Sequence, residues 1–153
     1  MRAKDYARAL YKFIDLESPP IRLDPILESL GIDLIEGEID NVDGIAFKDQ
    51  GSKSIIVNRG LDPEQKRFAI AHELGHIVMP HSGAYRICFP ANDRRIELDA
   101  DRFAAELLMP EPTMIKLWPR YRDNTEYRVS IMAELFAVSK SAMAARVRQL
   151  RLK

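Results

Sequence analysis

The stretch Arg67–Gly83, RFAIAHELGHIVMPHSG, carries the clearest indications of fold and chemistry in this chain of 153 residues. It contains every histidine of the sequence: His72, His76 and His81. The residues before it have the pattern of a helix start. Asp62 is placed as N-cap, Pro63 stands at the first helical position, and Gln65 completes a capping box. We therefore expect a long helix that begins after Asp62 and ends near Pro80.

The spacing of two histidines on this helix allows them to bind one metal ion. His72 and His76 lie one turn apart on the same face, so each can place a ring nitrogen about 2 Å from a shared ion. Glu73 is rotated by about 100 degrees from His72, close enough to reach a water on the metal without binding the metal itself. This is the HExxH arrangement, here HELGH, and it predicts Glu73 as a general base. The alternative is an ordinary helix with partly buried histidines, because short patterns also arise by chance.

A catalytic zinc site needs three protein ligands, so the sequence should supply one more. His81 follows Pro80 and therefore lies off the helix, which makes it the weaker candidate. A second long helix is expected from about Asp93 to Met109, and Glu97 and Asp101 share one face of it. A nearby cation would offset their repulsion, with Glu97 as third ligand and Asp101 accepting the free N–H of a ligand histidine. The alternative is a solvated acidic face balanced by neighbouring arginines.

A glycine inside the histidine motif predicts how the two helices pack. Gly75 costs about 1 kcal/mol relative to alanine in a helix interior. A close crossing with another helix would explain its presence, and the alternative is a tolerated defect. The second helix carries an apolar stripe of Phe103, Leu107 and Leu108 that can press against the histidine helix.

The remainder of the N-terminal half predicts an α+β fold. One helix ends at Pro19, and a shorter one follows in LDPILESLG, where Gly31 stands past its end. Three stretches rich in β-branched residues come next, separated by the turn sequences NVDG and DQGS. They are Ile32–Ile39, Gly44–Lys48 and Lys53–Asn58. We expect a small, mostly antiparallel three-stranded sheet packed on the histidine helix, followed by an all-helical C-terminal part.

The last thirty residues, 124–153, resemble a helix-turn-helix pair. Helices are expected at Glu126–Ala137 and Lys140–Leu150, with Ser139 as cap, after a shorter one at Thr113–Trp118. The segment from Ser139 onwards has five basic and no acidic residues: Lys140, Arg146, Arg148, Arg151 and Lys153. This patch could bind DNA or an acidic protein surface. The favoured interpretation is a packing hairpin with solvated arginines and six core-facing residues: Leu135, Phe136, Val138, Met143, Val147 and Leu150.

The overall composition limits the classes of partner. Twenty-three basic and twenty-three acidic residues cancel, so the surface as a whole does not attract nucleic acid or an anionic membrane. The N-terminus lacks the pattern of a signal peptide, and no apolar run approaches the roughly 18 to 20 residues of a spanning helix. The single cysteine, Cys88, cannot form an internal disulfide. We expect a cytoplasmic protein with one domain, residues 1–153, and no membrane contact.

The two predicted helices also support a family resemblance. RFAIAHELGHIVM, followed by IELDADRFAAELLMPE, resembles the ImmA/IrrE family of metallopeptidases, and the similarity extends over most of the chain. The resemblance implies a zincin-like fold of the gluzincin type with a bound zinc, or alternatively manganese. By position, the metal ligands of the family match His72, His76 and Glu97, and its catalytic glutamate matches Glu73. The family often has Asn where this chain has Asp101.

The same resemblance implies a function, the cleavage of a helix-turn-helix transcriptional repressor inside the cell, which makes the protein an anti-repressor. The substrate would add as a strand to an exposed edge, for which we expect Ser54–Asn58. Tyr85, His81 and Arg86 are alternative oxyanion-stabilising residues. The competing hypothesis is a DNA-binding or repressor-binding regulator whose metal is structural or whose activity is latent. Glu73 distinguishes them, because a binding protein does not need a carboxylate at that place.

Overall fold

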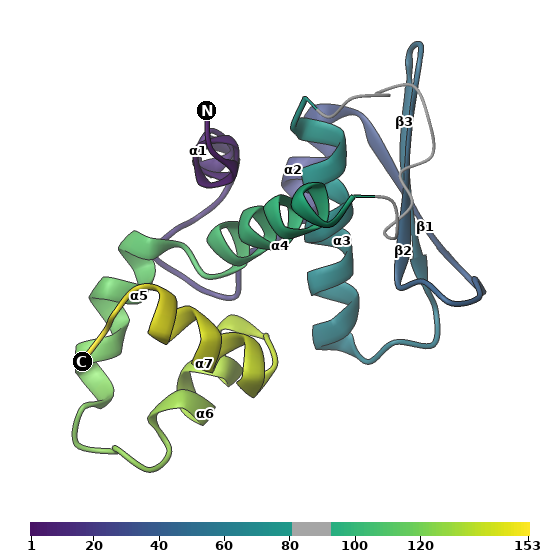
Figure 1. Ribbon diagram of the computed structural model, residues 1–153. Helices are drawn as coiled ribbons and strands as arrows, with labels where there is room; N and C mark the ends of the chain where they lie inside the picture. The colour runs from purple at the N-terminus through teal and green to yellow at the C-terminus, as the bar shows by residue number, and fades with distance from the viewer. Residues whose placement is uncertain (81–92) are drawn as a thin grey trace.

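The computed structural model describes residues 1–80 and 93–153 and has a small sheet at one end and helices over the rest (Figure 1). The helices are α1 (Ala3–Arg8), η1 (Tyr11–Phe13), α2 (Asp24–Leu30), α3 (Pro63–Val78), α4 (Arg94–Leu108), α5 (Glu111–Leu117), η2 (Trp118–Tyr121), α6 (Arg128–Phe136) and α7 (Lys140–Gln149). The strands are β1 (Ile32–Gly37), β2 (Gly44–Asp49) and β3 (Ser52–Asn58). The expected α+β class is confirmed. None of the helices in the described ranges is long and apolar enough to cross a bilayer.

The sheet is mixed, and its order is β1-β3-β2. β3 pairs in parallel with β1, where Ile32 lies opposite Lys53, and antiparallel with β2, where Gly44 lies opposite Val57. The prediction of a mostly antiparallel sheet is therefore only half right. The prediction that Ser54–Asn58 forms a free edge is wrong, since β3 is the central strand. Its buried Ile55 and Val57 suit a central position, where both backbone edges are paired.

Helix α3 begins and ends where the sequence predicts. The Asp62 carboxylate accepts from the Gln65 backbone N–H at 2.9 Å, and Pro63 occupies the first turn. The helix contacts β2 and β3, and the Lys48 ammonium of β2 donates to the carbonyl of Ile77 at 2.9 Å. The described structure thus places α3 between the sheet and α4 (Figure 1).

Helices α3 and α4 cross closely at Gly75. A Cβ atom at this position would lie 3.0 Å from Cδ1 and 3.3 Å from Cβ of Phe103. Phe103 is fully buried, together with Leu107 and Leu108 of the same helix. The close crossing expected from Gly75 is confirmed, and it fixes the distance between the two helices.

Substitution of Gly75 by valine is expected to lower the free energy of unfolding by about 1 to 3 kcal/mol, because the added methyl groups would overlap the buried Phe103 ring. The midpoint of urea unfolding, followed by circular dichroism, measures this. Combining Gly75→Val with Phe103→Leu should cost less than the sum of the two single changes, because the smaller side chain leaves room. A Gly75→Val protein as stable as the wild type would contradict the close crossing.

The N-terminal segment differs from the expected single helix that ends at Pro19. α1 stops at Arg8, and a short 3-10 turn follows at Tyr11–Phe13. Contacts with distant residues hold this segment: the Tyr11 hydroxyl bonds the Glu106 carboxylate, and the Thr113 hydroxyl donates to the carbonyl of Leu16 at 2.8 Å. These tertiary contacts override the helical spacing of the apolar residues.

The C-terminal helical pair forms as predicted, with one correction to its charge. Ser139 caps α7 by accepting from the Ala142 N–H at 3.1 Å. Three of the six residues expected to face the core, Phe136, Val138 and Met143, are buried, and the other three pack partly against it. Arg146 does not belong to the basic surface, because only 3% of its side chain is exposed. Its guanidinium bonds the Glu106 carboxylate of α4 at 2.9 Å, a partner that the sequence did not reveal.

Candidate metal centre

Three side chains from two helices converge at the crossing of α3 and α4. The Nε2 atoms of His72 and His76 are 3.2 Å apart. One Glu97 oxygen lies 2.7 Å from Nε2 of His72, and the other lies 3.0 Å from Nε2 of His76. One donor atom from each of the three residues can be chosen so that all lie within 4.8 Å of one another.

This donor set fits a divalent metal ion. Two imidazole nitrogens and one carboxylate are ligands that zinc and similar ions accept. A tetrahedral ion with bonds of about 2.0 to 2.1 Å separates neighbouring ligands by about 3.3 Å. The observed separations between 2.7 and 3.2 Å are slightly tighter than that. A cation would relieve the approach of two nitrogen lone pairs to each other and to a carboxylate.

Asp101 lies against the first of the two histidines. Its carboxylate lies 2.8 Å from Nδ1 of His72, which leaves Nε2 of that ring directed at Glu97 and His76. Burial lowers the pKa of His72, but the hydrogen bond to Asp101 and the charges of Glu73, Asp101 and Glu97 outweigh it and raise the pKa. The surroundings of the ring are therefore strongly negative and favour a cation.

Glu73 lies beside this cluster on α3 and is almost completely buried, with 2% of its surface exposed. Burial, followed by the charges of Glu97 and Asp43, raises the pKa of Glu73 to about 7, against the opposing effect of His72. Its Oε2 atom has no hydrogen-bond partner within residues 1–80 and 93–153. Burying a carboxylate oxygen without a donor costs free energy, so its presence here calls for an explanation such as a functional role.

A pocket of about 330 Å³ opens in front of these residues. Its walls come from α3, α4 and the turn that leads into β2, and His72, Glu73, Glu97 and Asp101 all line it. The sheet approaches closely here: a Cβ at Gly44 would lie 3.0 Å from Cγ of Glu73. A larger side chain at Gly44 would therefore displace Glu73.

The structure brings together all five residues that the sequence singled out, namely His72, Glu73, His76, Glu97 and Asp101. Their roles as ligands, base and orienting group stay predictions. The three oxyanion candidates, His81, Tyr85 and Arg86, lie outside the described residues, as does Cys88. Sequence reasoning missed Asp43, Gly44 and Phe68, which also line the pocket. NVDG showed only turn chemistry, and nothing local indicated that this turn faces α3.

Comparisons with known proteins agree with this geometry. A peptidase family model described as the IrrE N-terminal-like domain matches residues 27–148. No curated protein matches the sequence. A Mycobacterium tuberculosis transcriptional regulator has a similar fold, with a TM-score of 0.61 and 15% sequence identity. The similarity covers 95% of this chain but 46% of that one, so the chain spans about half the length of this structural neighbour. Because the family model covers most of the sequence, the chain belongs to the family of IrrE N-terminal-like peptidase domains.

Proposed function

We propose that this protein is a metal-dependent endopeptidase in which His72, His76 and Glu97 hold a zinc ion. The observation that carries the proposal is the position of Glu73. Its buried Oε2 has no hydrogen-bond partner among the described residues and lies beside three converging metal-type donors. A purely structural metal site needs the donors but has no use for such a carboxylate. The family assignment supports peptide hydrolysis as the reaction.

In the proposed mechanism Glu73 moves a proton. When bound, the metal ion lowers the pKa of a water and polarises the scissile carbonyl. Glu73 takes a proton from the attacking water and transfers it to the leaving amine. Asp101 keeps the His72 ring in one tautomer. Gly44 leaves the space in which the Glu73 side chain lies.

We propose that the substrate binds as an extended strand along β2. This strand is at one end of the sheet and pairs only with β3 among the described strands. Gly44, the first residue of β2, lies against Glu73, which would bring a peptide bond on this edge to the metal centre. β2 therefore takes the place of Ser54–Asn58 in this role.

We further propose that the protein cut is a helix-turn-helix transcriptional repressor and that the cleavage takes place in the cytoplasm. This part rests on the resemblance to the ImmA/IrrE family. The competing function is a DNA-binding or repressor-binding regulator with a latent metal site. The structural neighbour is named a transcriptional regulator, which is the reason to test this alternative. Cleavage of purified repressor by the wild-type protein, with no cleavage after removal of metal by a chelator, tests the enzymatic proposal.

Substitution of Glu97 by glutamine is expected to lower metal affinity at least tenfold, because the neutral amide replaces a charged oxygen donor that faces both histidines. Elemental analysis of protein purified without added metal, followed by competition with a chelator, measures the affinity. Asp99→Asn is the matched control, since Asp99 lies on the same helix and pairs with Arg102 on the surface. Equal metal content in wild-type and Glu97→Gln protein would mean that another residue is the third ligand.

A further inference from the structure

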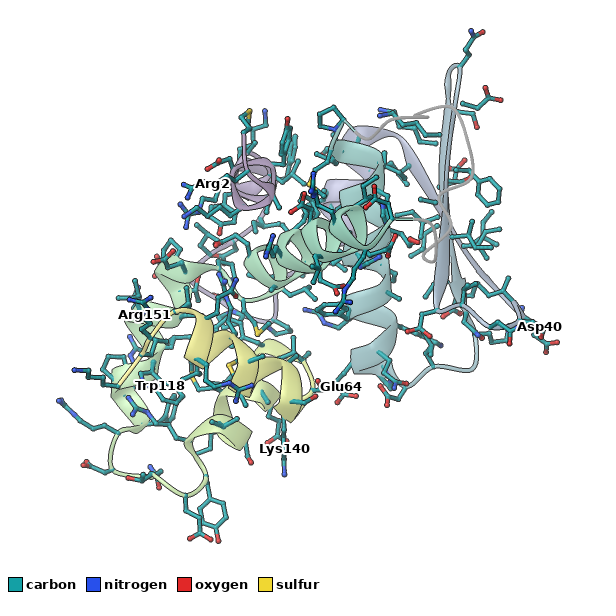
Figure 2. All side chains as sticks on the ribbon, in the orientation of Figure 1. Arg2, Asp40, Glu64, Trp118, Lys140 and Arg151 are labelled. Carbon is teal, nitrogen blue, oxygen red and sulfur yellow. The ribbon has the colours of Figure 1, made fainter. Side chains whose placement is uncertain are left out.

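A second pocket adjoins the metal pocket. It has a volume of about 330 Å³ and lies between the first turns of α3 and the start of α7. Asp43 and Phe68 line both pockets, so the two pockets are adjacent on the surface. In Figure 2 Glu64 stands at the end of α3 that faces α7, where this second pocket lies.

The wall formed by the helical pair is held in place by Arg67 of α3. Its guanidinium donates to the carbonyls of Ile21 at 2.9 Å, Ala137 at 3.1 Å and Phe136 at 3.3 Å. These bonds tie the turn between α6 and α7 to α3. Ala137 has a left-handed backbone with φ of 54°, and α7 starts directly after the capping residue Ser139. This wall of the pocket is therefore fixed by contacts within the chain.

The chemistry of the pocket is apolar inside and acidic at its rim. Phe68, Val138 and Ala142 supply carbon surface, and Asp43 and Glu64 supply negative charge. Lysine and arginine are absent from the described residues that line this pocket and from those that line the metal pocket. An apolar side chain next to a cationic one matches both features.

We propose that this pocket is a substrate subsite that takes an apolar side chain flanked by lysine or arginine in an extended peptide. The proposal rests on the proposed function, since it adds a specificity site to the same peptidase. The peptide would pass from the metal centre over Phe68 to the start of α7. It follows that the protein prefers basic segments of its substrate and discriminates against acidic ones.

The same proposal gives the helical pair a function. In DNA-binding helix-turn-helix proteins the first residues of the second helix contact the bases. Here the corresponding residues Ser139, Ser141 and Ala142 line the pocket instead. The start of α7 then selects peptide rather than DNA.

The first test fills the pocket without touching the metal centre. Ala142→Phe places a ring in the apolar part, and Ala145→Phe is the matched control, because Ala145 is exposed on the same helix and does not line the pocket. Cleavage of a randomised peptide library gives the preference at each position. We expect the wild type and Ala145→Phe to select an apolar residue beside lysine or arginine. For these peptides Ala142→Phe should lower kcat/KM about tenfold or more, with metal content unchanged.

The second test changes the charge of the rim. Glu64→Lys should reduce the preference for lysine and arginine by about two- to fivefold. Glu38→Lys, an exposed acidic position outside both pockets, should not change it. Unchanged selection in both Ala142→Phe and Glu64→Lys, while the library is still cut, would overturn the subsite and leave the peptidase intact.

A binding measurement separates the subsite from the peptidase proposal. Glu73→Gln protein loaded with zinc is incubated with the same library, and the bound peptides are sequenced, so that no cleavage is needed. One outcome is that the wild type cleaves no peptide, while peptides with basic and apolar residues are enriched by binding and Ala142→Phe abolishes this enrichment. In that case the subsite stands and the peptidase proposal fails. If no peptide class is enriched or acidic peptides are preferred, the subsite proposal is wrong.

Discussion

Glu73→Gln is expected to lower the rate of peptide hydrolysis by about 10²- to 10⁴-fold, the range for loss of a general base. Glutamine keeps the shape of the buried side chain but cannot accept a proton at the Oε2 position. The donor atoms of His72, His76 and Glu97 are not altered, so metal content should equal that of the wild type. Single-turnover cleavage and elemental analysis on the same preparation measure both quantities.

Comparison with Glu97→Gln distinguishes a catalytic base from a metal ligand. Glu73→Gln should lose activity and keep metal, whereas Glu97→Gln should lose both. Retention of nearly full activity by Glu73→Gln would exclude Glu73 as the base. Loss of metal from Glu73→Gln would place Glu73 among the ligands instead of beside them.

The largest expected effect on stability comes from Glu106→Ala, which should lower the free energy of unfolding by about 3 to 5 kcal/mol. Glu106 is 2% exposed and bonds Arg146 at 2.9 Å and the Glu111 backbone N–H at 3.1 Å. The Tyr11 hydroxyl also donates to it. Removing the carboxylate leaves the buried Arg146 charge without its counter-ion. Urea unfolding at neutral pH measures the loss.

Two control variants show whether the loss comes from the buried ion pair. Glu106→Leu combined with Arg146→Met should recover much of the stability, because it removes both buried charges together. Glu111→Ala breaks the half-exposed pair between Arg8 and Glu111 and should cost less than about 1 kcal/mol. A loss for Glu106→Ala no larger than that for Glu111→Ala would contradict the assignment.

The Glu106 contribution should also depend on pH. Burial raises the pKa of Glu106, but hydrogen bonds from Tyr11, the Glu111 backbone and Arg146 outweigh it and lower the pKa below 4.5. The stabilisation by ionised Glu106 is therefore complete above about pH 4.5 and is lost as the pH falls through the lowered pKa of this group. The difference in unfolding free energy between wild type and Glu106→Gln should shrink over that acid range.

The sequence predicted the parts of the site that depend on local spacing. His72, Glu73 and His76 share a helix whose cap and proline mark its start, and Glu97 and Asp101 share the next one. Residues at fixed separations on a helix face the same way whatever surrounds the helix. Gly75 added the one long-range clue, a position where another helix comes close.

The features that the sequence did not predict depend on distant partners. The pairing of β1 with β3 joins strands that are not consecutive, and no residue pattern within either strand specifies it. Arg146 looked like a surface cation because its partner Glu106 is 40 positions away. The turn at Asp43 joins the metal pocket only because β2 folds back against α3. Such contacts follow from tertiary packing rather than from local sequence.

The two ends of α4 make different contacts. Glu97, near its start, faces the two histidines, and Glu106, near its end, pairs with Arg146 of α7. If metal binding at one end and docking of α7 at the other favour the same position of α4, the two events are thermodynamically linked. A metal ion that binds only the native arrangement stabilises it by RT ln(1 + [L]/Kd). Such a coupling is reciprocal, so loosening Arg146 from Glu106 would then weaken metal binding by the same free energy by which the metal strengthens that contact. With the proposed metal at Glu97, metal affinity would then report on contacts at a helix far along the chain.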